Sequence, residues 1–176
     1  MRTSRAPLLT VAVFAAALGA APVRAAALKV GDKAPDVTAP LSDGTTFKLS
    51  AWLDRAPLVL YFYPKDGTPG CTKEACALRD DFPRLQGLKA TVIGISYDGI
   101  ASHRKFIAEH HLPFLLASDS DKKAAKAFGV DGLFFARRST FIVGKDGTIL
   151  YADPSVDPKK NSKEVRDFLA TLAPAK

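Results

Sequence analysis

The chain has 176 residues, 47% of them apolar, which is enough for one domain with a hydrophobic core. Its formal net charge is +7, but the lysines are scattered and no basic stripe with interleaved aromatic residues occurs, which argues against nucleic-acid binding. The only two cysteines have four residues between them, which is not the spacing of a zinc or copper pair, so we expect no bound metal.

The first 25 residues have the pattern of a secretory signal peptide. Arg2 and Arg5 form a positive start, Ala6–Ala21 is an uncharged apolar run of 16 residues, and small residues around Ala25 suit cleavage. The run is shorter than the ~20 residues of a membrane span, although an uncleaved anchor helix is the alternative. We therefore expect a soluble, exported, periplasmic protein whose mature domain has a net charge of +4. That location permits disulfide bonds.

From residue 28 onward, strand and helix patterns alternate without a repeat or a linker, which predicts one domain over residues 28–176. In chain order the patterns predict a strand at 45–49, a strand at 58–63, a helix at 69–87, a strand at 90–96, a helix at 101–111, a strand at 114–119, a helix at 120–129, two strands at 138–144 and 148–153 joined by a hairpin turn, and a helix at 162–172. The run LVLYFY at 58–63 is continuously apolar, which is typical of a buried central strand. This order predicts an α/β fold with a mixed central sheet flanked by helices.

Two features qualify the predicted helices. Pro83 should kink or shorten the helix at 69–87, because proline lacks the N–H that an interior helical position donates.

His103, His110 and His111 cluster on one predicted surface helix, and we interpret all three as solvated residues rather than ligands or catalytic groups.

Cys71 falls in the first turn of a predicted helix. Thr68 suits the N-cap and Pro69 the first helical position, in the sequence TPGCTKEAC. The unpaired N–H groups and the positive end of the helix dipole at that turn favour an ionised thiolate. A thiolate is nucleophilic, and its first oxidation product is a sulfenic acid. The position therefore indicates a reactive cysteine.

Cys76 lies five residues further along the same helix. Ideal helical geometry separates its Cα from that of Cys71 by about 8.7 Å, and a disulfide does not close beyond about 7 Å. A bond between the two sulfurs therefore requires the helix to unwind. A permanent structural disulfide and a metal pair are the alternatives, but the pair suits a role that alternates between a helical reduced form and an unwound oxidised form.

With these residues in view, the segment YFYPKDGTPGCTKEACALRDDF resembles the peroxiredoxins, and within them the bacterioferritin comigratory protein or PrxQ branch. The family pattern Pro-x-x-x-Thr-x-x-Cys is filled by Pro64, Thr68 and Cys71, Cys76 matches the resolving cysteine of the branch, and RSTFIVGKDG matches the segment that carries the active-site arginine, here Arg138. The resemblance implies a thioredoxin-like fold, a Cys71–Cys76 disulfide, and reduction of hydrogen peroxide and alkyl hydroperoxides. It further implies no bound cofactor, a thioredoxin-like dithiol donor and a monomer.

For the residues that match the family pattern, a catalytic role can be argued from their chemistry, and a simpler structural role is the alternative. Arg138 would hold the thiolate ionised and stabilise charge on the peroxide oxygens, while Arg137, which alternates with it, is assigned to the surface. Thr68 would direct its hydroxyl at the thiolate and the peroxide, or only cap the helix. Pro64 would shield the pocket from water, or only end the strand.

Three questions stay open at this point. Phe134 and Phe135 would line an entrance for organic peroxides, form a docking patch for the reductant, or pack in the core. A thiol–disulfide oxidoreductase is a rival function, but it expects Cys-x-x-Cys. A copper chaperone on the same fold is another, but it expects three intervening residues and a distal histidine.

Overall fold

The computed structural model describes residues 26–173, so the predicted signal peptide lies outside the described residues. The elements in chain order are β1 (Thr38–Pro40), β2 (Thr46–Lys48), the 3-10 turn η1 (Leu49–Trp52), β3 (Leu58–Phe62), α1 (Pro69–Gly87), β4 (Thr91–Ser96), α2 (Ile100–His110), β5 (Leu115–Ser118), α3 (Lys123–Ala127), β6 (Ser139–Val143), β7 (Ile149–Asp153) and α4 (Asn161–Leu172). Five of the strands form one sheet in the order β5-β4-β3-β6-β7. β3 pairs in parallel with β4 and antiparallel with β6, which confirms the predicted mixed sheet.

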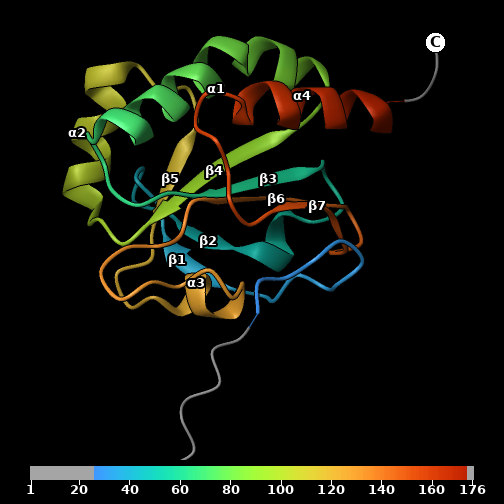
Figure 1. Ribbon diagram of the computed structural model, residues 1–176, viewed down its shortest axis with the longest axis horizontal. Coiled ribbons are helices and arrows are strands. Elements are labelled where there is room, and N and C mark those ends of the chain that lie inside the picture. The colour runs from blue at the N-terminus through green and yellow to red at the C-terminus, as the bar shows by residue number, and fades with distance from the viewer. Residues whose placement is uncertain (1–25, 174–176) are drawn as a thin grey trace, which may run out of the picture.

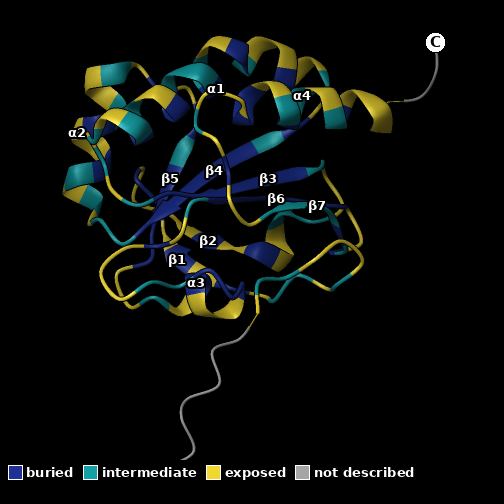
Figure 2. Ribbon diagram, viewed as in Figure 1, coloured by how far each residue is buried: buried dark blue, intermediate teal, exposed yellow. Residues whose placement is uncertain are grey.

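The sheet separates two apolar clusters, and Figure 1 shows the elements that cover its two faces. Helices α1, α2 and α4 cover one face, and α3 with the β1–β2 hairpin lies on the other. Every residue of β3 is buried, and successive side chains alternate between the two faces. Val59 and Tyr61 join the cluster under the helices, whereas Leu60 and Phe62 join the opposite cluster. The continuous apolar run thus reflects a central strand that is covered on both sides (Figure 2).

Helix α1 is not shortened by Pro83, contrary to the expectation, and it continues to Gly87. Contacts with α4 hold the helix just before this proline. Asp81 accepts hydrogen bonds from Ser162 Oγ at 2.6 Å and from Arg166 Nη1 at 2.8 Å. Because tertiary bonds fix the segment next to Pro83, the loss of one backbone hydrogen bond does not end the helix.

Helix α3 is shorter than predicted, because it begins at Lys123 rather than near Ser120. The Lys122 amide donates to the Asp119 carbonyl at 2.9 Å and closes a turn before the helix. The Asp119 carboxylate then accepts hydrogen bonds from the amides of Ala124 and Ala125 at 2.9 and 2.8 Å. Asp119 therefore satisfies the first N–H groups of α3 from outside the helix and sets its start.

The structure also corrects the interpretation of one histidine. His103 on α2 is buried, with a side chain that is 0% exposed, whereas His111 is exposed. α2 turns His103 toward the sheet, where the side chain meets the loop after β3. Within residues 26–173, none of the helices combines the length and the apolar character that crossing a bilayer requires.

Candidate active site

Cys71 is the third residue of α1 and is only 1% exposed. Thr68 occupies the N-cap and Pro69 the first helical position, as the sequence predicts. The Thr72 amide donates to the Thr68 carbonyl at 2.8 Å, which is the first bond of the helix. The thiol therefore lies in a turn whose preceding N–H groups have no helical partner, and it is a free cysteine.

Arg138 reaches this thiol because of the register of β6 on β3. Ser139, the first residue of β6, pairs with Phe62, the last residue of β3, so the preceding Arg138 lies beside the loop that leads into α1. Its Nη2 donates to Cys71 Sγ at 3.2 Å. A Cβ at Gly70 would lie 3.4 Å from the same nitrogen, so the absent side chain leaves room for the guanidinium against the first turn.

Glu74 completes this group, and the sequence analysis did not identify it. Its side chain is 0% exposed and accepts hydrogen bonds from Arg138 Nη1 and, at 2.7 Å, from Asn161 Nδ2 of α4. Burial raises the pKa of Glu74 above its usual value, although both partners oppose the shift. The available signal was its spacing: position i+3 from Cys71 lies on the same side of a helix.

The charge of Arg138 is secured by these neighbours. Burial alone would lower the pKa of the guanidinium, but the Glu74 carboxylate and Cys71 outweigh that effect, and the pKa is raised. Arg138 therefore stays a fixed cation with one nitrogen on the sulfur and another on a carboxylate. Arg137, by contrast, is exposed and its side chain donates to the Gly129 carbonyl.

Thr68 and Pro64 flank the thiol in the loop after β3. The Thr68 hydroxyl does not cap α1, contrary to one expectation, but donates to the Lys65 carbonyl at 3.0 Å. This bond uses the hydroxyl proton, so the oxygen keeps its lone pairs for accepting a hydrogen bond. Pro64 is half-buried between Tyr63 and this turn.

Cys76 is a half-buried free thiol in the middle of the unbroken α1. The continuous helix keeps its Cα about 8.7 Å from that of Cys71, too far for a disulfide. Arg79, one turn further on, donates to the His110 carbonyl at 2.9 Å. Its hydrogen bond to Asp80 raises the pKa of Arg79, and nearby Cys76 adds to the shift. The structure thus shows the two thiols apart, with a cation beside the second.

Phe134 and Phe135 do not pack in the core. Leu133 and Phe134 are 78% and 74% exposed, and Phe135 is also exposed, so these residues form an apolar surface in the loop before β6. Within residues 26–173, no cluster of three or more histidine, cysteine, aspartate or glutamate side chains is arranged to hold a metal ion.

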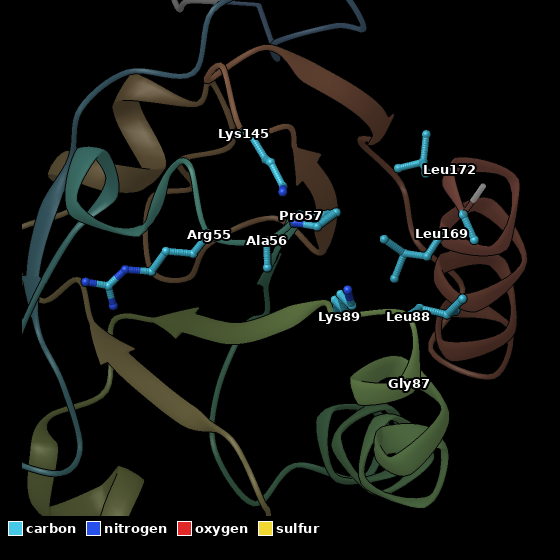
Figure 3. Close-up of a pocket in the computed structure, with 10 residues that line it drawn as sticks. Arg55, Ala56, Pro57, Gly87, Leu88, Lys89, Lys145, Leu169 and Leu172 are labelled. Carbon is cyan, nitrogen blue, oxygen red and sulfur yellow. The ribbon is translucent and has the colours of Figure 1, made fainter.

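A cavity of about 360 Å³ lies at the opposite end of α1 from Cys71, between the ends of α1 and α4 and the chain that enters β3. Figure 3 shows Leu169 and Leu172 facing it from α4, with Lys145 reaching toward Pro57. None of the residues around Cys71 lines this cavity, so it is separate from the thiol site.

Known proteins are similar to this chain in sequence and fold. The model of the AhpC/TSA family matches residues 30–152. Peroxiredoxin Bcp of Bacillus subtilis is 43% identical over 154 residues, which cover 83% of this chain and 98% of that protein. The chloroplastic peroxiredoxin Q of Oryza sativa subsp. japonica is 40% identical over 146 residues, which cover 81% of this chain and 67% of that protein.

Solved structures agree with the relatives. Peroxidoxin BcpB from Mycobacterium tuberculosis superposes with a TM-score of 0.79 at 33% identity, covering 83% of this chain and 99% of that one. A Cys-to-Ser variant of Xylella fastidiosa PrxQ has a TM-score of 0.79 at 33% identity, covering 84% and 99%. The predicted thioredoxin-like fold is thereby confirmed.

A free cysteine at the start of a helix, beside a half-buried arginine and on the fold of the peroxiredoxins, is the arrangement expected of a thiol-dependent peroxidase. This chain belongs to the AhpC/TSA family, and its relatives are peroxiredoxins of the Q or Bcp type. The family resemblance predicted from the sequence is confirmed, and the disulfide oxidoreductase and copper chaperone alternatives are set aside.

Proposed function

We propose that Cys71 is the peroxidatic cysteine of this peroxidase. The observation that carries the proposal is the 3.2 Å contact from Arg138 Nη2 to Cys71 Sγ in the first turn of α1. The thiolate attacks one oxygen of a hydroperoxide, the O–O bond breaks, and the other oxygen leaves as an alkoxide or hydroxide that takes up a proton. Cys71 becomes a sulfenic acid.

Four side chains assist this step. Arg138 stabilises the thiolate and the charge that develops on the leaving oxygen, because it is a fixed cation with spare donors. Glu74 holds Arg138 in that orientation. Thr68 accepts a hydrogen bond from the hydroperoxide O–H, since its own proton is engaged by Lys65. Pro64 presents no N–H and shields the sulfur from water.

Cys76 then resolves the sulfenic acid. The first turns of α1 unwind, the Cys76 thiolate attacks Cys71 Sγ, and a disulfide forms with loss of water. Arg79 places a positive charge next to Cys76. A thioredoxin-like dithiol restores both thiols by exchange, and no bound cofactor takes part.

The substrate range includes hydrogen peroxide and alkyl hydroperoxides. Support for the alkyl class comes from the bacterioferritin comigratory protein of Xanthomonas campestris, whose structures are described in terms of alkyl peroxide reduction. It is 31% identical, with a TM-score of 0.75, and covers 84% of this chain and 99% of that one.

The signal-like pattern of the first 25 residues supports a periplasmic location. The family resemblance supports a monomer. Cytosolic thioredoxin does not reach that compartment, so the reductant is a periplasmic dithiol carrier that is supplied with electrons through the membrane. In a Cys71→Ser variant, the Cys76 thiolate would attack the disulfide of the oxidised carrier and hold it as a mixed disulfide, with one carrier thiol released.

Peroxide consumption with dithiothreitol tests the roles of the two cysteines, using wild type, Cys71→Ser and Cys76→Ser. We expect Cys71→Ser to lose activity, and Cys76→Ser to complete one stoichiometric turnover before it depends on external thiol. One equivalent of peroxide should remove two hydrogens from the intact mass of wild type without adding oxygen. Equal loss in both variants at the first turnover would contradict the assignment.

A further inference from the structure

A buried polar network holds the loop between β3 and α1. Asp66 lies in this loop, and its side chain is only 6% exposed. Its carboxylate accepts hydrogen bonds from Tyr63 Oη at 2.6 Å, from Ser102 Oγ at 2.8 Å and from His103 Nδ1 at 2.9 Å. Its amide donates to Asp98 Oδ2 at 2.9 Å. One residue thus ties the loop to β3, to α2 and to the segment between β4 and α2.

Hydrogen bonds rather than packing position this loop. Next to Asp66, Gly67 has φ +69° and a Cβ there would meet nothing within 4 Å. A hollow of about 150 Å³ lies over the same two residues. Burial alone would raise the pKa of Asp66, but the bonds from His103 and Tyr63 outweigh it, and the pKa stays below its usual value. The carboxylate is therefore ionised and depends on its donors.

His103 is an unusual donor. Its side chain is 0% exposed, and its second ring nitrogen, Nε2, is buried without a hydrogen-bond partner. A buried, unpartnered nitrogen lowers stability, and such groups are uncommon in native proteins. A leucine at this position would remove the unpartnered nitrogen, but it would leave the Asp66 carboxylate one donor short. The bond from Nδ1 to Asp66 is therefore the contribution of His103 that a leucine cannot replace.

We infer that His103 is a positioning residue for the peroxide step, acting through Asp66 on the loop that carries Thr68. Only one residue separates Asp66 from Thr68, and Cys71 follows three residues later. The loop therefore fixes where the Thr68 hydroxyl and the first turn of α1 stand relative to Arg138. This inference rests on the proposed function and assigns to it a residue that lies outside the cysteine motif.

A matched pair of variants isolates the hydrogen bond. Leucine and asparagine have nearly the same size and shape, but only asparagine can donate to Asp66 from the position of Nδ1. We expect His103→Leu to slow the reaction of Cys71 with hydrogen peroxide about tenfold, as for the loss of one hydrogen bond to a charged group. His103→Asn should recover most of the wild-type rate. Competition with a second peroxidase for limiting peroxide measures this rate constant.

Ile149→Ala provides the control for general loss of stability. Ile149 is buried in the cluster on the other face of the sheet, away from α1 and α2. Its truncation should lower the melting temperature but leave the peroxide step unchanged. The inference is overturned if His103→Leu reacts as fast as wild type, if His103→Asn is as slow as His103→Leu, or if Ile149→Ala slows the reaction equally. A wild type as inert as Cys71→Ser would instead overturn the proposed function, and this inference with it.

Discussion

Replacing Glu74 by glutamine should make the chain resist overoxidation. The sulfenic acid on Cys71 has two fates: it forms the disulfide with Cys76, or a second peroxide oxidises it to a sulfinic acid. The first path requires α1 to unwind. Glu74 lies between the two cysteines, and its bonds to Arg138 and Asn161 exist only while that stretch is helical. Weakening them favours the unwound form.

The magnitude follows from the two hydrogen bonds. Each bond to a charged group contributes about 1.5–3 kcal/mol. Glutamine keeps one acceptor oxygen for either Arg138 or Asn161, and its amide N–H faces the other donor. We therefore expect a loss of about 2 kcal/mol, or roughly 30-fold in the equilibrium between folded and unwound α1. Glutamine relieves the burial of a carboxylate, but it also leaves the charge of Arg138 without its counter-ion, and these two effects oppose each other.

Intact mass after exposure to graded peroxide measures the outcome. The concentration that adds two oxygen atoms to half of the molecules should rise by about the same 30-fold factor, since disulfide formation competes directly with the second oxidation. Glu109→Gln is the control, because Glu109 is an exposed α2 residue paired with Lys105 at 3.7 Å. If Glu74→Gln is overoxidised at the wild-type concentration or a lower one, Glu74 does not hold the folded form.

Two further predictions concern Arg138 and Asp81. Arg138→Lys should slow the peroxide step by about 10²–10³-fold, because a single ammonium cannot contact Cys71 and Glu74 together as the guanidinium does. Competition kinetics measure this rate. A rate near that of wild type would contradict the role of the two guanidinium contacts. The pKa of Asp81 lies below its usual value of 3.8. Burial alone would raise it, but hydrogen bonds such as that from Ser162 outweigh the effect of burial. The ionised Asp81 therefore stabilises the fold above pH 3.8, and this stability is lost as the pH falls through the lowered pKa. The free energy of unfolding in urea should therefore depend less on pH in that range for Asp81→Asn than for wild type. An identical pH dependence would contradict this.

The main elements were predictable because their signals are local. The apolar run at 58–63 became the central strand β3, and Pro69 and Gly87 became the ends of α1. The hairpin turn Lys145–Gly147 lies between β6 and β7 as expected. Continuous apolar runs and capping residues act within a few positions of the chain, so a single sequence contains them.

The missed features depend on partners that are distant in sequence. Glu74 and His103 each look like an ordinary surface residue of a helix. Both are buried in the fold. Glu74 is hydrogen-bonded to Asn161, 87 residues away, and His103 is hydrogen-bonded to Asp66, 37 residues away. The short α3 follows from the Asp119 carboxylate, which satisfies the first amides of that helix. Apolar periodicity identifies the buried face of a helix, but it does not show which distant polar group will contact a charged residue on that helix.

The attachment of α1 to α4 divides that helix into two halves with different tasks. Beyond Cys76, Ser162 bonds the Ala77 carbonyl and Asp81, so the rear half is fastened to its neighbour. Ahead of Cys76, the side-chain hydrogen bonds to the helix come from Arg138, on Cys71 and Glu74, and from Asn161, on Glu74. Cys76 lies at the border between the half of α1 that unwinds and the half that stays attached to α4. Each round of oxidation can then rearrange a few residues while the packed centre of the molecule stays intact.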